Sequence, residues 1–372
     1  MGQSETENLT VTEPPSENAQ SKPSLDPRAH SAHSSDRSLS PENLTLSPVL
    51  VPEDDILYDD MKNYYGARAD RIELIVDHII SQVYMVTLKG TRYILKILPE
   101  KIIDPEKEGA LADFMNENGI RAPRVIKNKY GQYVSQYGKK RFHIQEYIEG
   151  DVFDINCAPE WFMEKSPQLL GKIQKALIDY DKLPSMLDET FFNVTTIDTR
   201  RKMCEDVLAT TQDAHTVSLI NNRLRHLERV RPFEFDMSRF TNSNSHADFY
   251  ITQVIRNGRE LTTVDWTLAS YIPVCFEVIM SYSYADPICK TGRIDADRFK
   301  RYIEEYSKYF TLNDYDLAMM PYLYYFQLSA YNFVPPYDNL SEDYYKCAIL
   351  SDNVVDWFYD NVEDLSRSLR EM

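Results

Sequence analysis

Short alternating runs of apolar and polar residues fill the first part of this chain, between about residues 71 and 148. Alternation with a period of two, bounded by turn residues, is typical of half-buried strands. The runs predicted as strands are Arg71–Val76, Gln82–Leu88, Thr91–Leu98, Lys129–Gln136 and Lys140–Ile148. Lys89-Gly90 and Gly138 supply turns between them. We therefore expect a small antiparallel sheet.

Helical spacing of apolar residues interrupts this β-rich part and then replaces it. Pro105–Asn118 places Ala110, Leu111 and Phe114 on one face, and Gly119 follows its end, which predicts a helix. A shorter helix is predicted before the sheet, ending near Gly66. After Gly150 the pattern is mostly helical to Met372. The predicted fold class is α+β, with a small sheet-containing lobe followed by a larger helical lobe.

The first 50 residues carry a different composition. They are rich in Ser, Pro, Glu, Asn and Thr and nearly free of aromatic residues. Such a segment buries too little apolar surface to offset the entropy lost on ordering, so disorder is predicted. The expected organisation is a tail over 1–50, a first lobe over 51–148 and a second lobe over 149–372.

Charge and cysteine content restrict the partners and the compartment. The formal net charge is −17, which argues against nucleic acid and an anionic membrane surface as partners, because both require basic patches. The five cysteines are scattered without CxxC spacing, as expected for reduced thiols in a cytoplasmic protein. No apolar run of membrane-spanning length occurs. We expect a cytoplasmic monomer or homodimer.

The helical part is broken once, by a hairpin between two acidic residues. Asn257-Gly258 is a strong signal for a two-residue type I′ turn, and it joins the predicted strands Gln253–Arg256 and Glu260–Val264. The hairpin brings Gln253 and Asp265 toward one open end, with Asp248 just before its first strand. These three polar groups are therefore expected to lie together.

This layout is typical of phosphoryl transfer, in which one carboxylate takes a hydroxyl proton and other oxygens hold Mg²⁺. Asp248 would be the base, and Gln253 and Asp265 would be metal ligands. A plain loop aspartate is the alternative for Asp248, and a structural hydrogen bond is the alternative for Asp265. His246 is expected to anchor the loop through hydrogen bonds.

A lysine and a glutamate upstream complete the candidate site. Lys96 lies in a predicted strand and faces opposite to Leu95 and Ile97, so it is either exposed or directed at phosphates. Glu108 on the next helix is available to pair with it. A Lys–Glu pair of this kind positions the α- and β-phosphates of ATP.

From about Asp54 to the C-terminus, the order of these residues resembles the aminoglycoside phosphotransferase / choline kinase-like family, whose fold is protein-kinase-like. His246-Ala247-Asp248 resembles the family's HGD motif, and Leu170-Gly171-Lys172-Ile173-Gln174 resembles its LGxLH helix. Glu108, Gly119 and Arg121-Ala122-Pro123 resemble its E…GI-x-x-P stretch. The resemblance implies a two-lobe small-molecule kinase.

By this resemblance Asp248 is the catalytic base, Gln253 and Asp265 bind Mg²⁺, and Lys96 with Glu108 holds the phosphates of ATP. Glu146 and Tyr147 would provide the adenine-contacting backbone.

Four departures from the family pattern accompany the resemblance. Ala247 stands for Gly, a mild change if the backbone there is not left-handed. Gln253 stands for Asn, and Gln174 stands for His. The phosphate-covering turn, residues 76–81, contains no glycine, and Ser81 offers its hydroxyl and N–H there instead.

The predicted function is transfer of the ATP γ-phosphate to a hydroxyl of a small molecule, such as an amino sugar or amino alcohol. The glycine-free turn leaves one alternative, a catalytically weak or inactive kinase-like binding or scaffold protein. The acceptor is expected between the catalytic loop and the C-terminal helices, although most of the tyrosines there are expected to pack helices together. The residues considered are Tyr271, Glu277, Tyr282, Tyr284, Asp286 and the run 322–326.

Overall fold

A computed structural model of the chain describes residues 48–77, 82–100, 104–185, 187, 188, 190–338, 340 and 342–372. All of these residues belong to the unit Thr45–Met372. Of the predicted tail, residues 1–47 lie outside the described residues. Val49–Leu50, at its end, form the short strand β1 by pairing with β2.

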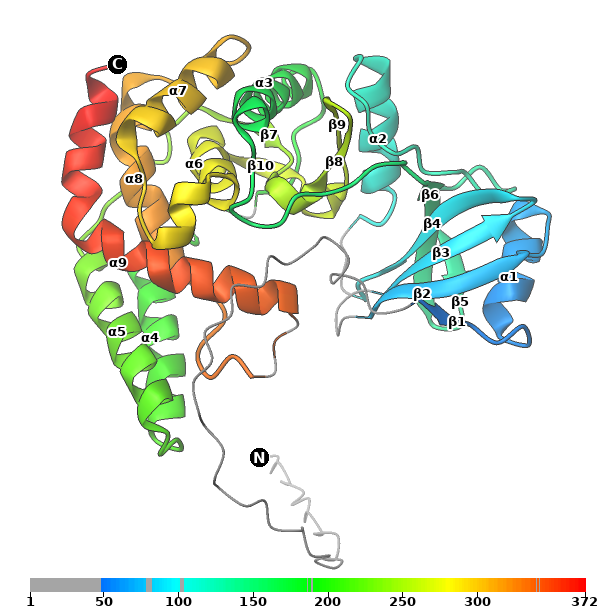
Figure 1. The fold of residues 1–372 in the computed structure, drawn as a ribbon, viewed down its shortest axis with the longest axis horizontal. Coiled ribbons are helices and arrows are strands. Elements are labelled where there is room, and N and C mark those ends of the chain that lie inside the picture. Colours follow the sequence, from blue (N-terminus) through cyan, green and yellow to red (C-terminus); the bar gives the residue numbers. More distant parts are fainter. Residues whose placement is uncertain are drawn as a thin grey trace, which may run out of the picture. The chain divides into compact units, whose positions relative to one another are not determined.

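A six-stranded antiparallel sheet forms the first part of the unit (Figure 1). Its order is β1-β2-β3-β4-β6-β5. The longer strands are β2 (Arg71–Asp77), β3 (Gln82–Leu88), β4 (Thr91–Leu98) and β6 (Lys140–Glu146). Helix α1 (Ile56–Tyr65) packs its apolar face on this sheet through Leu57, Tyr58 and Met61.

One predicted strand is wrong over most of its length. Only Ser135–Tyr137 (β5) pairs with β6, whereas residues 129–134 form a turn. Asn128 stabilises the turn, because its side-chain oxygen accepts hydrogen bonds from the backbone of Tyr130 (2.9 Å) and Gln132 (3.2 Å). Hydrogen bonds between the backbone and the Asn128 side chain thus replace the hydrogen bonds between strands that were predicted here.

Helix α2 (Lys107–Glu117) confirms the predicted helix. Its buried apolar residues do not belong to the hydrophobic cluster that the sheet forms. Its apolar residues Leu111, Ala112 and Met115 belong to the large hydrophobic cluster formed mainly by the C-terminal helices. The sheet and α1 form a separate cluster. Glu108, on the first turn of α2, is thereby carried next to the helical part of the chain.

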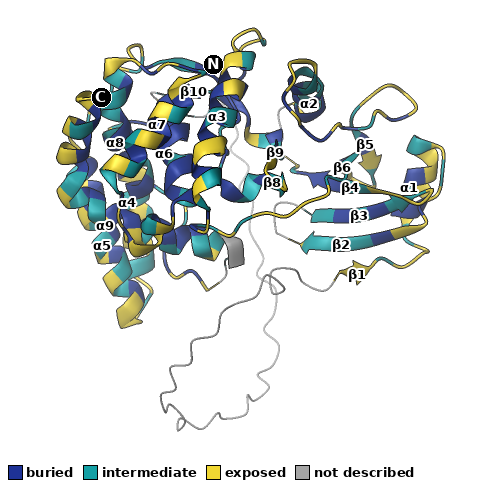
Figure 2. Cartoon of the chain, turned by 45° about the horizontal axis from the view of Figure 1, so that its top comes forward, coloured by how far each residue is buried: buried dark blue, intermediate teal, exposed yellow. Residues whose placement is uncertain are grey.

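The second part is mostly helical. Its helices are α3 (Glu160–Leu177), α4 (Val194–Leu208), α5 (Ala214–Val230), α6 (Val274–Ala285), α7 (Ala296–Ser307), α8 (Asp314–Ser329) and α9 (Glu342–Arg370). Figure 2 shows the buried faces of α6 and α8 at the centre of this bundle. Two short β ladders interrupt the helices: β7 (Asn242–Ser245) with β10 (Ser270–Pro273), and β8 (Val254–Asn257) with β9 (Glu260–Thr263).

The structure confirms the α+β, two-part fold class, with an antiparallel sheet first and helices afterwards. The predicted boundaries at residues 50 and 148 remain predictions. None of the described helices combines the length and the apolar character that a membrane span requires.

Candidate active site

The loop between β7 and β8 carries the HxD motif, and the predicted hairpin follows it. The predicted hairpin is present, and its two-residue loop is Gly258-Arg259, because Asn257 still pairs with Glu260. The predicted type I′ turn centred on Asn257-Gly258 is wrong, since Gly258 has a positive φ of 59° but Asn257 does not. The backbone N–H of Val264 donates to the carbonyl of Gln253 at 2.9 Å. This bond closes the open end of the hairpin, where Asp265 begins.

His246 anchors the loop, as the sequence predicts. Its side chain is fully buried, and Nε2 donates to the carbonyl of Val264 at 2.9 Å. Burial lowers the pKa of His246 to about 4, so the ring is neutral near pH 7. The ring also packs on Trp266, with 4.7 Å between centroids. His246 therefore ties the catalytic loop to the strand that presents Asp265.

Ala247 in place of Gly would be a mild change only if the backbone there were not left-handed, and the structure does not meet this condition. Its φ is 63°, in the left-handed region, as is that of Asp265 at 60°. A residue with a Cβ pays about 1–2 kcal/mol for this conformation. The surrounding hydrogen bonds of His246 and Phe249 hold the loop in place despite that cost.

Asp265 lies beside Lys96. Lys96 is buried, and its ammonium group donates to the carboxylate of Asp265 and, at 3.5 Å, to Oε2 of Glu108. Burial acts to raise the pKa of Asp265, but the charge and hydrogen bond of Lys96 outweigh it, so the pKa is lowered. The two acidic partners likewise raise the pKa of Lys96 against the opposing effect of burial. Lys96 stays charged and Asp265 ionised at neutral pH.

Thr267 is a member of this network that the sequence analysis missed. Its hydroxyl accepts from Lys96 Nζ at 2.7 Å and donates to Oε2 of Glu108 at 3.0 Å. It lies on the 3₁₀ turn η3 (Trp266–Leu268), for which Asp265 is the N-cap. Nothing in the sequence Val-Asp-Trp-Thr-Leu around Thr267 indicated this contact.

Lys107 joins helix α2 to the same turn. Its Nζ donates to the carbonyls of Thr267 at 2.9 Å and Ala269 at 2.8 Å. Burial lowers the pKa of Lys107. These bonds hold Glu108, the next residue, against the segment that follows Asp265.

Asp248 and Gln253 lie in the segment between β7 and β8, five residues apart. The amide nitrogen of Gln253 donates to Oδ2 of Asp248 at 3.5 Å. Burial, followed by the negative charges of Asp265 and Glu277, raises the pKa of Asp248 well above 3.8. A carboxyl group with a raised pKa is a stronger base once ionised. The structure thus brings together Asp248, Gln253, Asp265, Lys96 and Glu108.

Glu277 supports the catalytic loop from α6. Its Oε1 accepts from the backbone N–H of Phe249 at 2.9 Å, and its Oε2 is hydrogen-bonded by Ser245 and, at 3.3 Å, by Gln174. The side chain is fully buried. The expectation that Glu277 contributes to acceptor binding is therefore wrong. Gln174, in place of the family's His, serves this structural network.

We expect replacement of Glu277 by Gln to change how stability depends on pH. Burial raises the pKa of Glu277 from 4.5 to about 7, with smaller opposing hydrogen bonds from Ser245, Phe249 and Gln174. Between these pH values the native state holds a proton that the unfolded chain has released, so wild-type stability falls as pH rises. Glutamine does not titrate, so Glu277→Gln should not show this fall. The difference in unfolding free energy between Glu277→Gln and wild type should therefore shift in favour of the variant by up to about 3 kcal/mol between pH 4.5 and pH 7.5. Urea unfolding at several pH values measures this. Exposed Glu260→Gln is the control, and parallel profiles for Glu277→Gln and wild type would contradict the assignment.

The two predicted adenine-side residues lie at the end of β6. The carboxylate of Glu146 accepts hydrogen bonds from Arg121 Nη1 (2.8 Å) and from the backbone N–H of Arg124 (3.1 Å). The Arg92 guanidinium lies 4.1 Å from the ring centroid of Tyr147. Both side chains are thus engaged within the first part of the chain, and only their backbone is a candidate for nucleotide contact. Ser81 lies outside the described residues, as do residues 78–80 of the glycine-free turn.

Besides Glu277, two further residues considered for the acceptor are structural. Asp286 is buried and paired with Arg298 Nε at 2.7 Å. Tyr282 is buried against Phe299 and Tyr302. Tyr284 is different, because its ring lies 5.2 Å from that of Tyr250 in the catalytic loop.

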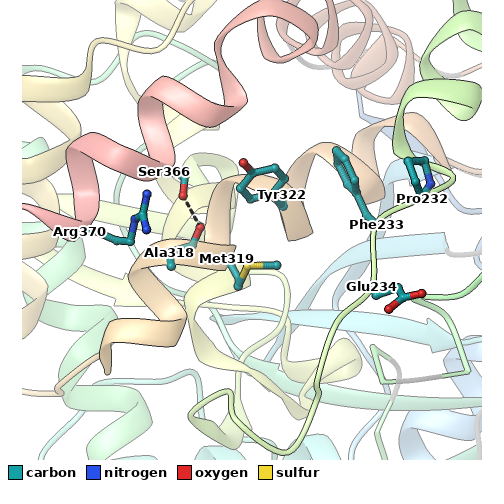
Figure 3. A pocket seen from close by; sticks show the side chains of 8 residues that line it. All are labelled: Pro232, Phe233, Glu234, Ala318, Met319, Tyr322, Ser366 and Arg370. Carbon is teal, nitrogen blue, oxygen red and sulfur yellow. Dashed lines mark hydrogen bonds between the residues drawn. The ribbon is translucent and has the colours of Figure 1, made fainter.

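A pocket of about 380 Å³ lies away from these residues (Figure 3). It is lined by Pro232, Phe233, Glu234, Ala318, Met319, Tyr322, Ser366 and Arg370. The Ser366 hydroxyl is already used, because it donates to the carbonyl of Ala318 at 2.7 Å. Tyr322, from the run 322–326 considered for the acceptor, lines this pocket, but none of the described residues predicted to act in catalysis, nucleotide binding or metal binding does. The pocket is therefore separate from the candidate active site.

The donor atoms fit Mg²⁺. Within the described part of the chain, no hydrogen bond reaches Oδ2 of Asp265 or Oε1 of Gln253. The described residues contain no group of three or more His, Cys, Asp or Glu side chains that could hold a metal ion by themselves. Mg²⁺ takes one or two protein oxygens and fills its shell with water and substrate phosphates.

Comparison with known proteins agrees with this geometry. Residues 71–311 match the model of a phosphotransferase enzyme family. A comparison with curated proteins found no match.

Among solved structures, spectinomycin phosphotransferase with ADP and spectinomycin is 12% identical, with a TM-score of 0.56 over 85% of this chain and 98% of that one. A microcompartment-associated aminopropanol kinase is 11% identical, with a TM-score of 0.56 over 80% and 94%. An amicoumacin kinase with AMP-PNP and Ca²⁺ is 13% identical, with a TM-score of 0.52 over 79% and 88%.

At these identities the solved structures establish a shared fold, and the resemblance predicted from the motifs is confirmed. The family match extends over more than half of the sequence. The chain therefore belongs to the phosphotransferase enzyme family and is a kinase of small molecules.

Proposed function

We propose that this kinase transfers the γ-phosphate of ATP to a hydroxyl group of an amino sugar, an amino alcohol or a similar small molecule. The observation that supports this is that Asp248 is hydrogen-bonded to Gln253 and is within electrostatic reach of Asp265, which pairs with Lys96. The nucleotides named for the similar solved structures, ADP and AMP-PNP, agree with a nucleotide donor.

In this mechanism Asp248 orients the acceptor hydroxyl and takes its proton as the acceptor oxygen bonds to the γ-phosphorus. The bond from that phosphorus to the β,γ-bridging oxygen breaks, and ADP leaves with the bond's electron pair. Lys96, held by Glu108 and Thr267, supplies positive charge to the phosphates. Asp265 and Gln253 would hold Mg²⁺, which neutralises phosphate charge when bound.

The class of acceptor rests on charge and on the relatives. The net charge of −17 suits an amine-bearing substrate. Similar structures are named for spectinomycin and for aminopropanol. The cytoplasmic location stays a prediction from the cysteines, and the lobes 51–148 and 149–372 are our proposed domains.

Mg·ATP binding separates this proposal from the alternative of an inactive binding or scaffold protein. We expect millimolar Mg·ATP to raise the melting temperature, because a ligand of the native state stabilises it. A screen of hydroxyl-bearing metabolites and antibiotics for acceptor-stimulated ADP release then identifies the substrate. No stabilisation by Mg·ATP would overturn the proposal. Stabilisation without ADP release for any acceptor would favour the alternative.

A further inference from the structure

Two acceptors hold the amide nitrogen of Gln253. It donates to Oδ2 of Asp248 at 3.5 Å and to the hydroxyl oxygen of Tyr250 at 3.4 Å. A side-chain amide nitrogen carries two hydrogens, so both of its donors are used. The amide oxygen Oε1 has no such partner in the described part of the chain and is left for another ligand.

The backbone fixes Tyr250 and Gln253 relative to each other. The N–H of Gln253 donates to the carbonyl of Tyr250 at 2.9 Å across the 3₁₀ turn η2 (Ile251–Gln253). The N–H of Tyr250 donates to the carbonyl of Asp248, also at 2.9 Å. All three side chains therefore belong to one rigid loop.

The ring of Tyr250 is packed as well. It lies against Tyr284 of α6, with 5.2 Å between centroids and 51° between planes. A ring held by packing presents its hydroxyl with little loss of freedom, because only two side-chain torsions need to be fixed. Tyr250 is thus built to offer a stationary acceptor.

Gln253 needs such support more than a shorter amide does. Glutamine has one more rotatable bond than asparagine, and its amide group can turn either its oxygen or its nitrogen toward a cation. Only the oxygen binds Mg²⁺. Two acceptors on the nitrogen side select the orientation in which the oxygen faces away from Asp248 and Tyr250.

We propose that Tyr250 is a positioning residue, which fixes the Gln253 amide so that Oε1 faces the metal ion. This inference rests on the proposed function, because it assumes that Gln253 is a Mg²⁺ ligand. It adds the reason why a glutamine can occupy this position: the tyrosine three residues earlier restrains its extra torsion.

The test compares Tyr250→Phe with wild type. Calorimetry measures how AMP-PNP binding to each protein depends on the Mg²⁺ concentration. The variant keeps the ring and its packing on Tyr284 but loses the acceptor. We expect the Mg²⁺ concentration for half-maximal AMP-PNP affinity to rise about three- to tenfold, the loss that one hydrogen bond produces. Affinity for AMP-PNP without metal should be unchanged. Exposed Tyr130→Phe is the matched control.

The Gln253→Asn background sharpens the test. Asparagine lacks the extra torsion, so Tyr250→Phe should have much less effect on the Mg²⁺ requirement there than in the wild-type background. An electron paramagnetic resonance titration with Mn²⁺ reports the same coupling without turnover.

Three outcomes would overturn the inference. They are an unchanged Mg²⁺ requirement in Tyr250→Phe, an equal loss of affinity with and without Mg²⁺, and equal effects of Tyr250→Phe in both backgrounds. If wild-type protein shows no Mg²⁺-dependent AMP-PNP binding, the proposed function itself fails, and the role of Tyr250 fails with it.

Discussion

Replacing Asp248 by Asn is expected to lower kcat by a factor of about 10²–10⁴, the usual contribution of a general base. Asparagine keeps the size of the side chain and can still accept the hydrogen bond from Gln253, but it cannot take the acceptor's proton. The Kd for Mg·ATP should change by less than about threefold, because the proposed mechanism assigns Asp248 to the hydroxyl and Lys96 to the phosphates. Acceptor-stimulated ADP release and calorimetry with Mg·ATP measure the two quantities.

The pH profile gives this prediction a second readout. Asp248 acts only when ionised, and burial with the charges of Asp265 and Glu277 raises its pKa above 3.8. Wild-type activity should therefore fall with decreasing pH at a higher pH than an ordinary aspartate would cause. The residual activity of Asp248→Asn should lack that acid limb. Exposed Asp360→Asn on α9 is the control. Unchanged kcat in Asp248→Asn would contradict its role as the base, and equal losses of turnover and nucleotide affinity would indicate a structural role.

Local patterns in the sequence predicted the half of the site that depends on short-range geometry. Asn257-Gly258 predicted the hairpin, and the hairpin places Gln253 next to Val264 and Asp265. Alternation along β4 turned Lys96 away from the neighbouring Leu95 and Ile97, and the next helix supplied Glu108. Each of these inferences spans a few residues or one connection.

Contacts between distant segments were not predictable in the same way. Thr267 is joined to Lys96 across 171 positions and Lys107 to the same turn across 160, so no spacing could reveal either contact. The sequence also could not show that the apolar face of α2 packs with the C-terminal helices, because an amphipathic pattern does not name its partner. The predicted strand at 129–134 failed because a single side chain, Asn128, favoured a turn.

The position of Glu277 illustrates the same limit for charged residues. From the sequence, a carboxylate near the catalytic loop suggests recognition of an amine-bearing substrate. In the structure its oxygens are used by Ser245, Gln174 and the backbone of Phe249. A buried acid with several donors is a structural group, and only the three-dimensional arrangement distinguishes it from one that faces a ligand.

Replacing Asp265 by Asn should abolish most activity by a different route, through loss of the metal. Mg²⁺ binds a carboxylate far better than an amide, so AMP-PNP binding should lose its dependence on Mg²⁺. We expect kcat to fall on the order of 10³-fold, comparable to the loss of a preorganised electrostatic group at a transferring phosphate. A Mn²⁺ titration monitored by electron paramagnetic resonance, in the presence of AMP-PNP, measures the metal site without turnover. Exposed Glu260→Gln, in the same hairpin, is the matched control.

The structure predicts two further effects that set Asp265→Asn apart from Asp248→Asn. The charge of Asp265 raises the pKa of Asp248, so its removal should move the acid limb of any residual activity to lower pH. Lys96 would keep Glu108 and Thr267 as partners, so its buried charge would not be left unpaired, and Asp265→Asn should be less stable than wild type but still folded. Retained Mn²⁺ affinity in Asp265→Asn would show that this carboxylate serves Lys96 alone. In that case the metal would have to be bound elsewhere, and the division of roles between Asp248 and Asp265 would not hold.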